Sequence, residues 1–141
     1  MAKKKPVKIC CLNKQTILRL LLGFIFFFII LFSFTMLIIY KDVKSTCREA
    51  QREYQQDCVN SLIKLVKSDD KTYRQKNRAI WALGQLSDKR ALPLLQDLYI
   101  GEVPHKEPLD LTISQYEVSK AKKWCENGNA TSWMYRNQNT W

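Results

Sequence analysis

The chain has 141 residues, of which 46% are hydrophobic, and its 23 basic and 13 acidic residues give a formal net charge of +10. This length leaves room for one domain at most. The charge raises the question of nucleic-acid binding, but residues 1–40 hold no acidic residue, and beyond them 17 basic residues face all 13 acidic ones. Because this small excess is not clustered, we do not expect a nucleic-acid partner.

A long apolar run lies near the N-terminus. It begins at Leu20, ends at Ile39 and carries no charge. A helix of about 20 residues is about 30 Å long, which matches the hydrocarbon core of a bilayer. A cleaved signal peptide is the alternative, but its apolar region is usually only about 7–15 residues long. We therefore predict a basic cytoplasmic tail over residues 1–19 and an uncleaved transmembrane anchor over residues 20–40.

The basic residues around this run predict its orientation. More of them precede it than follow it closely, and those that follow are Lys41, Lys44, Arg48 and Arg52. The side with more lysine and arginine usually stays in the cytoplasm. We expect a single-pass protein of the cell membrane with a cytoplasmic N-terminus and an extracytoplasmic C-terminal domain.

Apolar residues recur at helical spacing after the run. The first apolar stripe consists of Val59, Leu62, Ile63 and Val66. One helix over residues 43–68 fits this stripe, and its charged first half is typical of a stalk, which we assign to residues 41–57. Asp69 or Asp70 is expected to end this helix and to cap the next one.

Two further stripes predict a helical hairpin. The first lies in a helix over about residues 72–86 and consists of Ala79, Ala82, Leu83 and Leu86. The second belongs to a helix that begins near Arg90, and it consists of Ala91, Leu94, Leu95 and Leu98. Pro93 falls in the first turn of that helix, where its missing N–H has no partner to lose. The short polar connection makes the two helices antiparallel.

This hairpin resembles a HEAT repeat of the short type first associated with phycobilin lyases. The resemblance runs from residue 71 to residue 99 and rests on Arg78, Ala79, Ala82, Leu83, Gly84, Leu86, Asp88, Ala91, Leu94, Leu95 and Leu98. The preceding half-helix is similar to the second helix of an upstream repeat. The resemblance implies an all-α fold with HEAT-like helices over residues 58–100, arranged as a small bundle or short solenoid that binds macromolecules through exposed helix faces. It does not by itself imply lyase activity.

Residues 101–141 are expected to cover the open end of the stack, because repeat arrays usually need about three units. We predict that Thr112 opens a helix with Gln115 completing a capping box, and that Gly128 ends it. The aromatic tail beyond Gly128 is either a hydrophobic lid over the stack or a patch that contacts a partner or the membrane interface.

Three cysteines lie in the predicted domain: Cys47, Cys58 and Cys125. If one helix carries the first two, about 16 Å separates them and they cannot bond to each other. In an oxidising compartment we then expect a disulfide from Cys125 to Cys47 or Cys58, with the remaining thiol free to link two chains. Three reduced thiols are the alternative.

These features favour a membrane-tethered interaction module without catalysis, cofactor or metal ion. The candidate residues for an unknown protein partner are Arg74, Arg90, Gln96, Asp97, Trp133, Tyr135 and Trp141. One alternative is a small thiol-dependent or lyase-like enzyme that uses Cys125 and His105, the only histidine. Another is a self-associating structural membrane protein that forms homodimers.

Overall fold

Helices make up the regular structure of the computed structural model, which describes residues 13–136. The α-helices are α1 (Lys14–Tyr54), α2 (Cys58–Lys67), α3 (Tyr73–Leu86), α4 (Leu92–Leu98) and α5 (Gln115–Asn127). Two short 3-10 helices, η1 (Lys89–Ala91) and η2 (Ser132–Tyr135), follow α3 and α5. No strand occurs within the described residues, so the expected all-α class is confirmed. Trp141 and most of the basic tail lie outside the described residues.

The chain divides into two units, Met1–Leu37 and Ile38–Trp141. In the first unit α1 is long and apolar enough, by length and composition, to cross a membrane. The two hydroxyl side chains of the apolar run, residues 20–39, bond back to the helix: Ser33 donates to the Ile29 carbonyl at 2.8 Å and Thr35 to the Leu31 carbonyl at 2.9 Å. Both hydroxyls are thus satisfied without water, as an apolar environment requires.

The last turns of α1 belong to the core of the second unit. Val43, Cys47 and Ala50 are fully buried and join the same hydrophobic cluster as the later helices. They recur at intervals of three and four residues, so they share one helix face. The expectation of a projecting stalk over residues 41–57 is therefore wrong, because one face of this segment is a packing surface.

The chain reverses between α1 and α2. The backbone of Gln55 has a φ of 52°, a left-handed conformation that ends α1 one residue earlier. Asp57 then caps α2, since its side chain accepts a hydrogen bond from the backbone N–H of Asn60. The predicted single helix over residues 43–68 is thus two helices joined by a tight turn.

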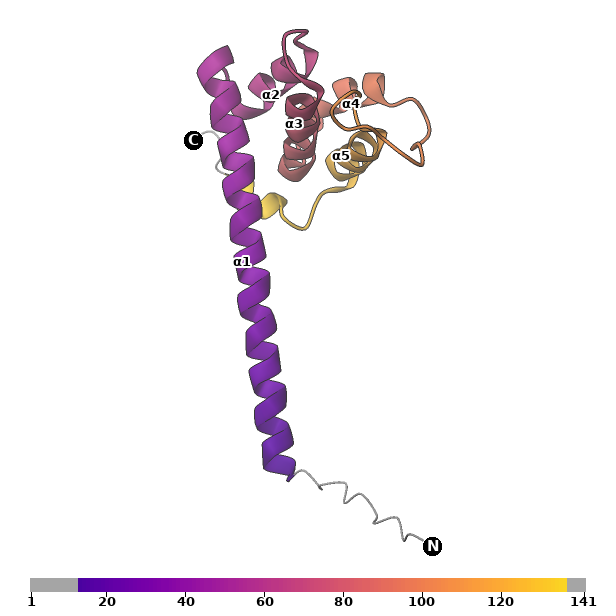
Figure 1. Ribbon diagram of the computed structural model, residues 1–141. Coiled ribbons are helices and arrows are strands. Elements are labelled where there is room, and N and C mark those ends of the chain that lie inside the picture. Colours follow the sequence, from indigo (N-terminus) through magenta and orange to yellow (C-terminus); the bar gives the residue numbers. More distant parts are fainter. Residues whose placement is uncertain (1–12, 137–141) are drawn as a thin grey trace, which may run out of the picture. The chain divides into compact units, whose positions relative to one another are not determined.

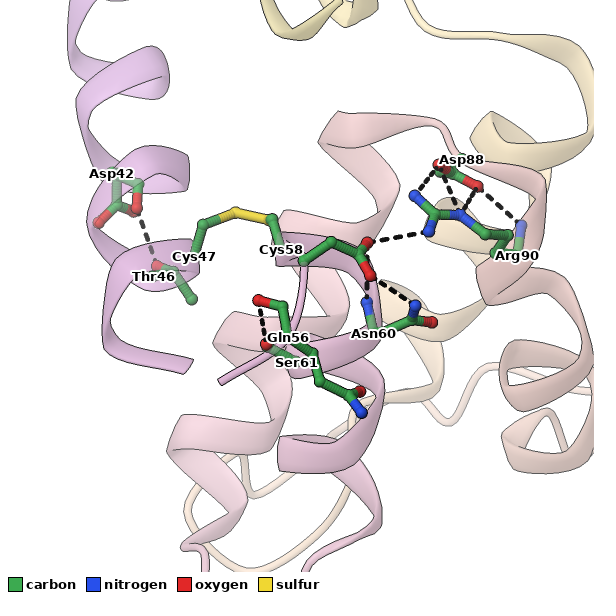
Figure 2. The surroundings of a disulfide bond; sticks show 10 residues. Asp42, Thr46, Cys47, Gln56, Cys58, Asn60, Ser61, Asp88 and Arg90 are labelled. Atoms are coloured by element: carbon green, nitrogen blue, oxygen red, sulfur yellow. Dashed lines mark hydrogen bonds and ion pairs between the residues drawn. A yellow bond between two sulfur atoms is a disulfide. The ribbon is translucent and has the colours of Figure 1, made fainter. Parts of the chain in front are cut away.

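This reversal brings Cys47 and Cys58 together in a disulfide (Figure 2). Their Cα atoms are 5.0 Å apart, inside the range that a disulfide bridges. The predicted pairing of Cys125 with Cys47 or Cys58 is therefore wrong, because it assumed an unbroken helix between the first two cysteines. Cys125 is a free, buried thiol. The disulfide ties the end of α1 to the start of α2.

The predicted hairpin is present as α3, η1 and α4. Thr72 rather than Asp69 or Asp70 caps α3, in a reciprocal capping box with Gln75. In Figure 1, α3 lies between α2 and α5, and α5 packs against both α3 and α4. Each helix thus covers its neighbour, as in a repeat stack.

The contact between α3 and α5 depends on Gly84. A Cβ atom at this position would lie 2.8 Å from the Cα of Ala121 and 3.1 Å from a ring carbon of Trp124. The two helices approach so closely only because position 84 has no side chain.

Helix α5 begins later than predicted. Ser114 is its N-cap and accepts a hydrogen bond from the backbone N–H of Glu117, so the predicted start at Thr112 with Gln115 as capping partner is wrong. Gly128 ends the helix with a φ of 89°, as expected.

The segment after α5 packs back onto the core. The side-chain oxygen of Gln85 accepts hydrogen bonds from Asn129 Nδ2 at 3.1 Å and from Thr131 Oγ1 at 2.7 Å. Tyr135 is only 1% exposed and stacks on Tyr40, with ring centroids 6.1 Å apart. The tail thus covers part of the core through Tyr135.

We predict that Gly84→Ala destabilises the domain by about 1–2 kcal/mol, because overpacking against Ala121 outweighs the better helix propensity of alanine. Thermal unfolding of the detergent-solubilised protein measures this. Arg74→Ala, on an exposed position of the same helix, is the control and should leave stability nearly unchanged. A more stable Gly84→Ala variant would contradict the close approach.

Breaking the disulfide should lower the free energy of unfolding by about 3 kcal/mol under the loop-entropy model. The loss is no larger because the two cysteines are only 11 residues apart. The measurement is the unfolding midpoint of the wild type and of Cys47→Ser with and without dithiothreitol. Of these two proteins, only the wild type should respond to the reductant. Cys125→Ser is the matched control and should keep the response, so a reductant-insensitive Cys125→Ser variant would show that Cys125 is in the bridge.

Candidate binding surface

The connection between α4 and α5 displays apolar side chains to solvent. Ile100 is 67% exposed and Leu111 is 69% exposed, and Val103 and Leu109 are also exposed. An open groove of about 460 Å³ lies along this connection, and its lining includes Tyr73, Ile100, Pro104, Lys106, Pro108 and Leu111. We call this groove and these exposed side chains the loop surface. Contiguous exposed apolar surface on a small domain is typical of interaction sites.

Asn77 fixes one end of the connection. This buried side chain donates to the carbonyls of Leu109 at 3.0 Å and Thr112 at 2.9 Å. Its oxygen accepts from the backbone N–H of Ser114 at 2.8 Å. Three hydrogen bonds from one buried amide therefore hold the chain just before α5 against α3.

Gln115 fixes the other end. Its side-chain nitrogen donates to the Leu98 carbonyl at 3.1 Å, and its side-chain oxygen accepts from the backbone N–H of Ile100 at 3.0 Å. The first residue of α5 is thereby bonded to the last residue of α4. These bonds hold Ile100 in place at the edge of the groove.

Glu107 fixes the middle of the connection by capping α5. Its carboxylate accepts from the backbone N–H of Gln115 at 2.5 Å, from Ser114 Oγ at 2.5 Å and from the backbone N–H of Tyr116 at 3.3 Å. A carboxylate at a helix N-terminus satisfies donors that have no partner inside the helix. The loop is therefore held at three points by polar side chains while its apolar ones face outward.

The charge left for a ligand in the groove is positive. Lys106 lines the groove, whereas the carboxylate of Glu107, which also lines it, is occupied by the start of α5. A second hollow of about 350 Å³ beside the loop includes His105, Tyr116 and Glu117. Burial raises the pKa of Glu117, the neighbouring charge of Glu107 raises it further, and Lys120 opposes the shift.

The residues predicted to bind a partner fall in different places. Arg74 is exposed on α3, next to Tyr73 of the groove, and Gln96 and Asp97 are exposed on α4. Arg90 forms ion pairs with Asp57 at 2.9 Å and with Asp88 at 2.8 Å (Figure 2). These contacts raise the pKa of Arg90, chiefly through the hydrogen bond to Asp88, and Arg90 in turn lowers the pKa of Asp88. Arg90 thus links Asp57, the N-cap of α2, to Asp88, the N-cap of η1.

The aromatic tail is divided. Trp133 is 64% exposed and remains a candidate for contact with a partner. Tyr135 is buried, so its assignment to a binding surface is wrong, and burial raises its pKa to about 12. Trp141 lies outside the described residues.

The two residues of the enzyme alternative have different environments. Cys125 is buried on α5, and its thiol donates to the Leu83 carbonyl at 3.7 Å. Burial raises the pKa of this thiol to about 12, so the thiolate is disfavoured at neutral pH. His105 lies on the exposed loop.

Sequence reasoning missed the polar residues that hold the loop. Asn77 shares a helix face with Ile80 and Gly84, at i+3 and i+7, so a polar residue on a packing stripe was the available signal. Glu107 gave no comparable signal, because it reaches the start of α5 from a loop of irregular conformation.

Replacing Asn77 by alanine should cost about 1–3 kcal/mol and loosen the connection, because the substitution leaves one backbone donor and two carbonyls without their partner. Hydrogen exchange by mass spectrometry should show faster exchange over residues 109–114. Asn127→Ala, which removes an exposed amide, is the control and should leave that exchange unchanged. Unaltered protection in Asn77→Ala would refute the anchoring role.

The hairpin agrees with a known repeat family. Residues 76–100, which hold most of α3 together with η1 and α4, match the family model described as PBS lyase HEAT-like repeat. No curated protein and no solved structure matches the chain. The predicted resemblance is thereby confirmed, and the chain carries a HEAT-like helical repeat.

Proposed function

We propose that the protein is a non-enzymatic interaction module that is tethered to the cell membrane by residues 20–39 and binds a partner protein through the loop surface. The observation that carries the proposal is the combination of an anchored backbone and outward apolar side chains. Asn77, Glu107 and Gln115 hold the loop, while Ile100 and Leu111 face solvent. A rigid apolar surface loses little entropy on binding.

The chemistry of the groove defines the kind of partner. Apolar contacts are offered by Ile100, Leu111 and Tyr73, and Lys106 supplies a positive charge at the same place. An apolar segment with an acidic residue beside it complements this lining. We therefore propose a protein segment of that kind, in keeping with the binding role common to helical repeats.

Two features support the membrane anchor and its orientation. The apolar part of α1 has the length of a bilayer core, and its side chains are not buried by the protein. The Cys47–Cys58 disulfide fits an oxidising space, and the basic residues before the span favour a cytoplasmic N-terminus. Both features support the proposal of a C-terminal domain outside the cytoplasm.

The alternatives find less support. The raised pKa of Cys125 opposes the activated thiolate that a thiol-dependent enzyme needs. Self-association through the odd cysteine is disfavoured because Cys125, the free thiol of the domain, is buried.

The test places a photocrosslinking amino acid at Leu111 of the full-length protein in intact cells. We expect a discrete adduct of higher mass, and external protease should shorten it if the domain lies outside. The same group at Glu126, on an exposed position near the end of α5, is the matched control and should give no discrete adduct. Ile100→Ser should weaken the adduct at position 111 at least about tenfold, because a buried isoleucine contributes about 1.5–3 kcal/mol.

Stability should not change in Ile100→Ser, since the side chain is exposed in the free protein. Replacing both Cys125 and His105 should leave the adduct intact. Equal adducts from positions 111 and 126, or none from position 111, would defeat the proposed binding role of the loop surface.

A further inference from the structure

The outer face of the last turns of α1 is basic. Lys41, Lys44, Arg48 and Arg52 recur at intervals of three and four residues, so they lie on one side of the helix. With Ser45 and Glu49 they line a shallow open hollow of about 280 Å³. We call Lys41, Arg48 and Arg52 the basic stripe, and Lys44 extends it while its ammonium lies 5.5 Å over the Tyr40 ring.

The acidic residues of the same segment are neutralised by other elements. Arg78 of α3 bonds Asp42 at 2.5 Å and reaches Glu49 at 3.7 Å. Lys71 bonds Glu53 at 2.6 Å. Within residues 13–136 no ion pair involves the basic stripe. The acidic residues of this helix are therefore paired with Arg78 and Lys71, and the face that carries the basic stripe is cationic.

The stripe starts where the apolar run ends. Lys41 follows Ile39 by two residues on an unbroken helix, so it lies about 3 Å beyond the run along the axis, and Arg48 and Arg52 lie about 14 and 20 Å beyond it. Lipid headgroups occupy about 5–8 Å outside the hydrocarbon core on each side. Lys41 thus lies at the depth of the headgroups. Arg48 lies within reach of the electric field of charged headgroups, which decays over about 8–10 Å.

We propose that the basic stripe binds anionic phospholipid headgroups of the leaflet from which α1 emerges. This inference rests on the proposed membrane anchor. Lys41 supplies a point charge at headgroup depth, whereas Arg48 and Arg52 lie farther out and attract the anionic surface through the field, Arg52 least. The contact would hold the first helix of the domain core at the membrane surface.

The test measures lipid selectivity by electron paramagnetic resonance. The full-length protein is reconstituted in phosphatidylcholine vesicles that contain trace spin-labelled phosphatidylglycerol or spin-labelled phosphatidylcholine. The ratio of the two association constants reports headgroup preference. Replacing Lys41, Arg48 and Arg52 by glutamine should lower this ratio about fivefold or more, since one cation near an anionic surface contributes about a factor of five.

The matched control replaces the exposed residues Arg74, Lys89 and Lys123 by glutamine, which removes the same net charge elsewhere. It should leave the ratio unchanged. An equal fall in both variants, or an unchanged ratio in the stripe variant, overturns the inference. If the stripe variant instead loses only the protein adduct at position 111, the stripe binds a protein and the lipid proposal fails. Wild-type protein that immobilises neither lipid overturns the anchor as well, which distinguishes the two failures.

Discussion

The burial of Val43, Cys47 and Ala50 is the contact on which the rest of the domain depends. These three side chains place the end of α1 in the same hydrophobic cluster as the buried residues of α2 and α3. Without them a single HEAT-like hairpin would expose one face, since a repeat buries its core only against neighbours. The disulfide fixes this arrangement, because it joins Cys47 to the first residue of the next helix.

Polar side chains from α3, α5 and the connection itself hold the exposed loop between α4 and α5 in shape. Asn77 and Gln115 bond to backbone atoms of the connection, and Glu107 closes the start of α5. Apart from the bond between Ser114 Oγ and Glu107, these bonds restrain backbone atoms, so the apolar side chains of the loop stay available. A small helical domain has few concave surfaces, and here an irregular connection supplies one.

Sequence patterns predicted the parts of the fold that repeat at helical spacing. The hairpin of α3 and α4 follows from its apolar stripes, and the HEAT-like resemblance rests on the same residues. The break at Gln55 was not predictable from spacing, because a polar residue can extend a helix as readily as leave it. Because that turn was not predicted, the predictions of a stalk over residues 41–57 and of a disulfide to Cys125 were both wrong. The loop surface was missed for a related reason: Glu107 acts through tertiary contacts, which local periodicity does not report.

The stacking of Tyr40 on Tyr135 has a consequence for biosynthesis. The first and last described elements of the second unit meet in this contact, so the core cannot close until the chain has been made as far as Tyr135. During synthesis the apolar face that carries Val43 and Ala50 stays exposed until the later elements have been made. A ribosome that stops before Thr131 would therefore release a chain with an open core, and a protease that recognises exposed apolar surface could tell that product from the finished protein.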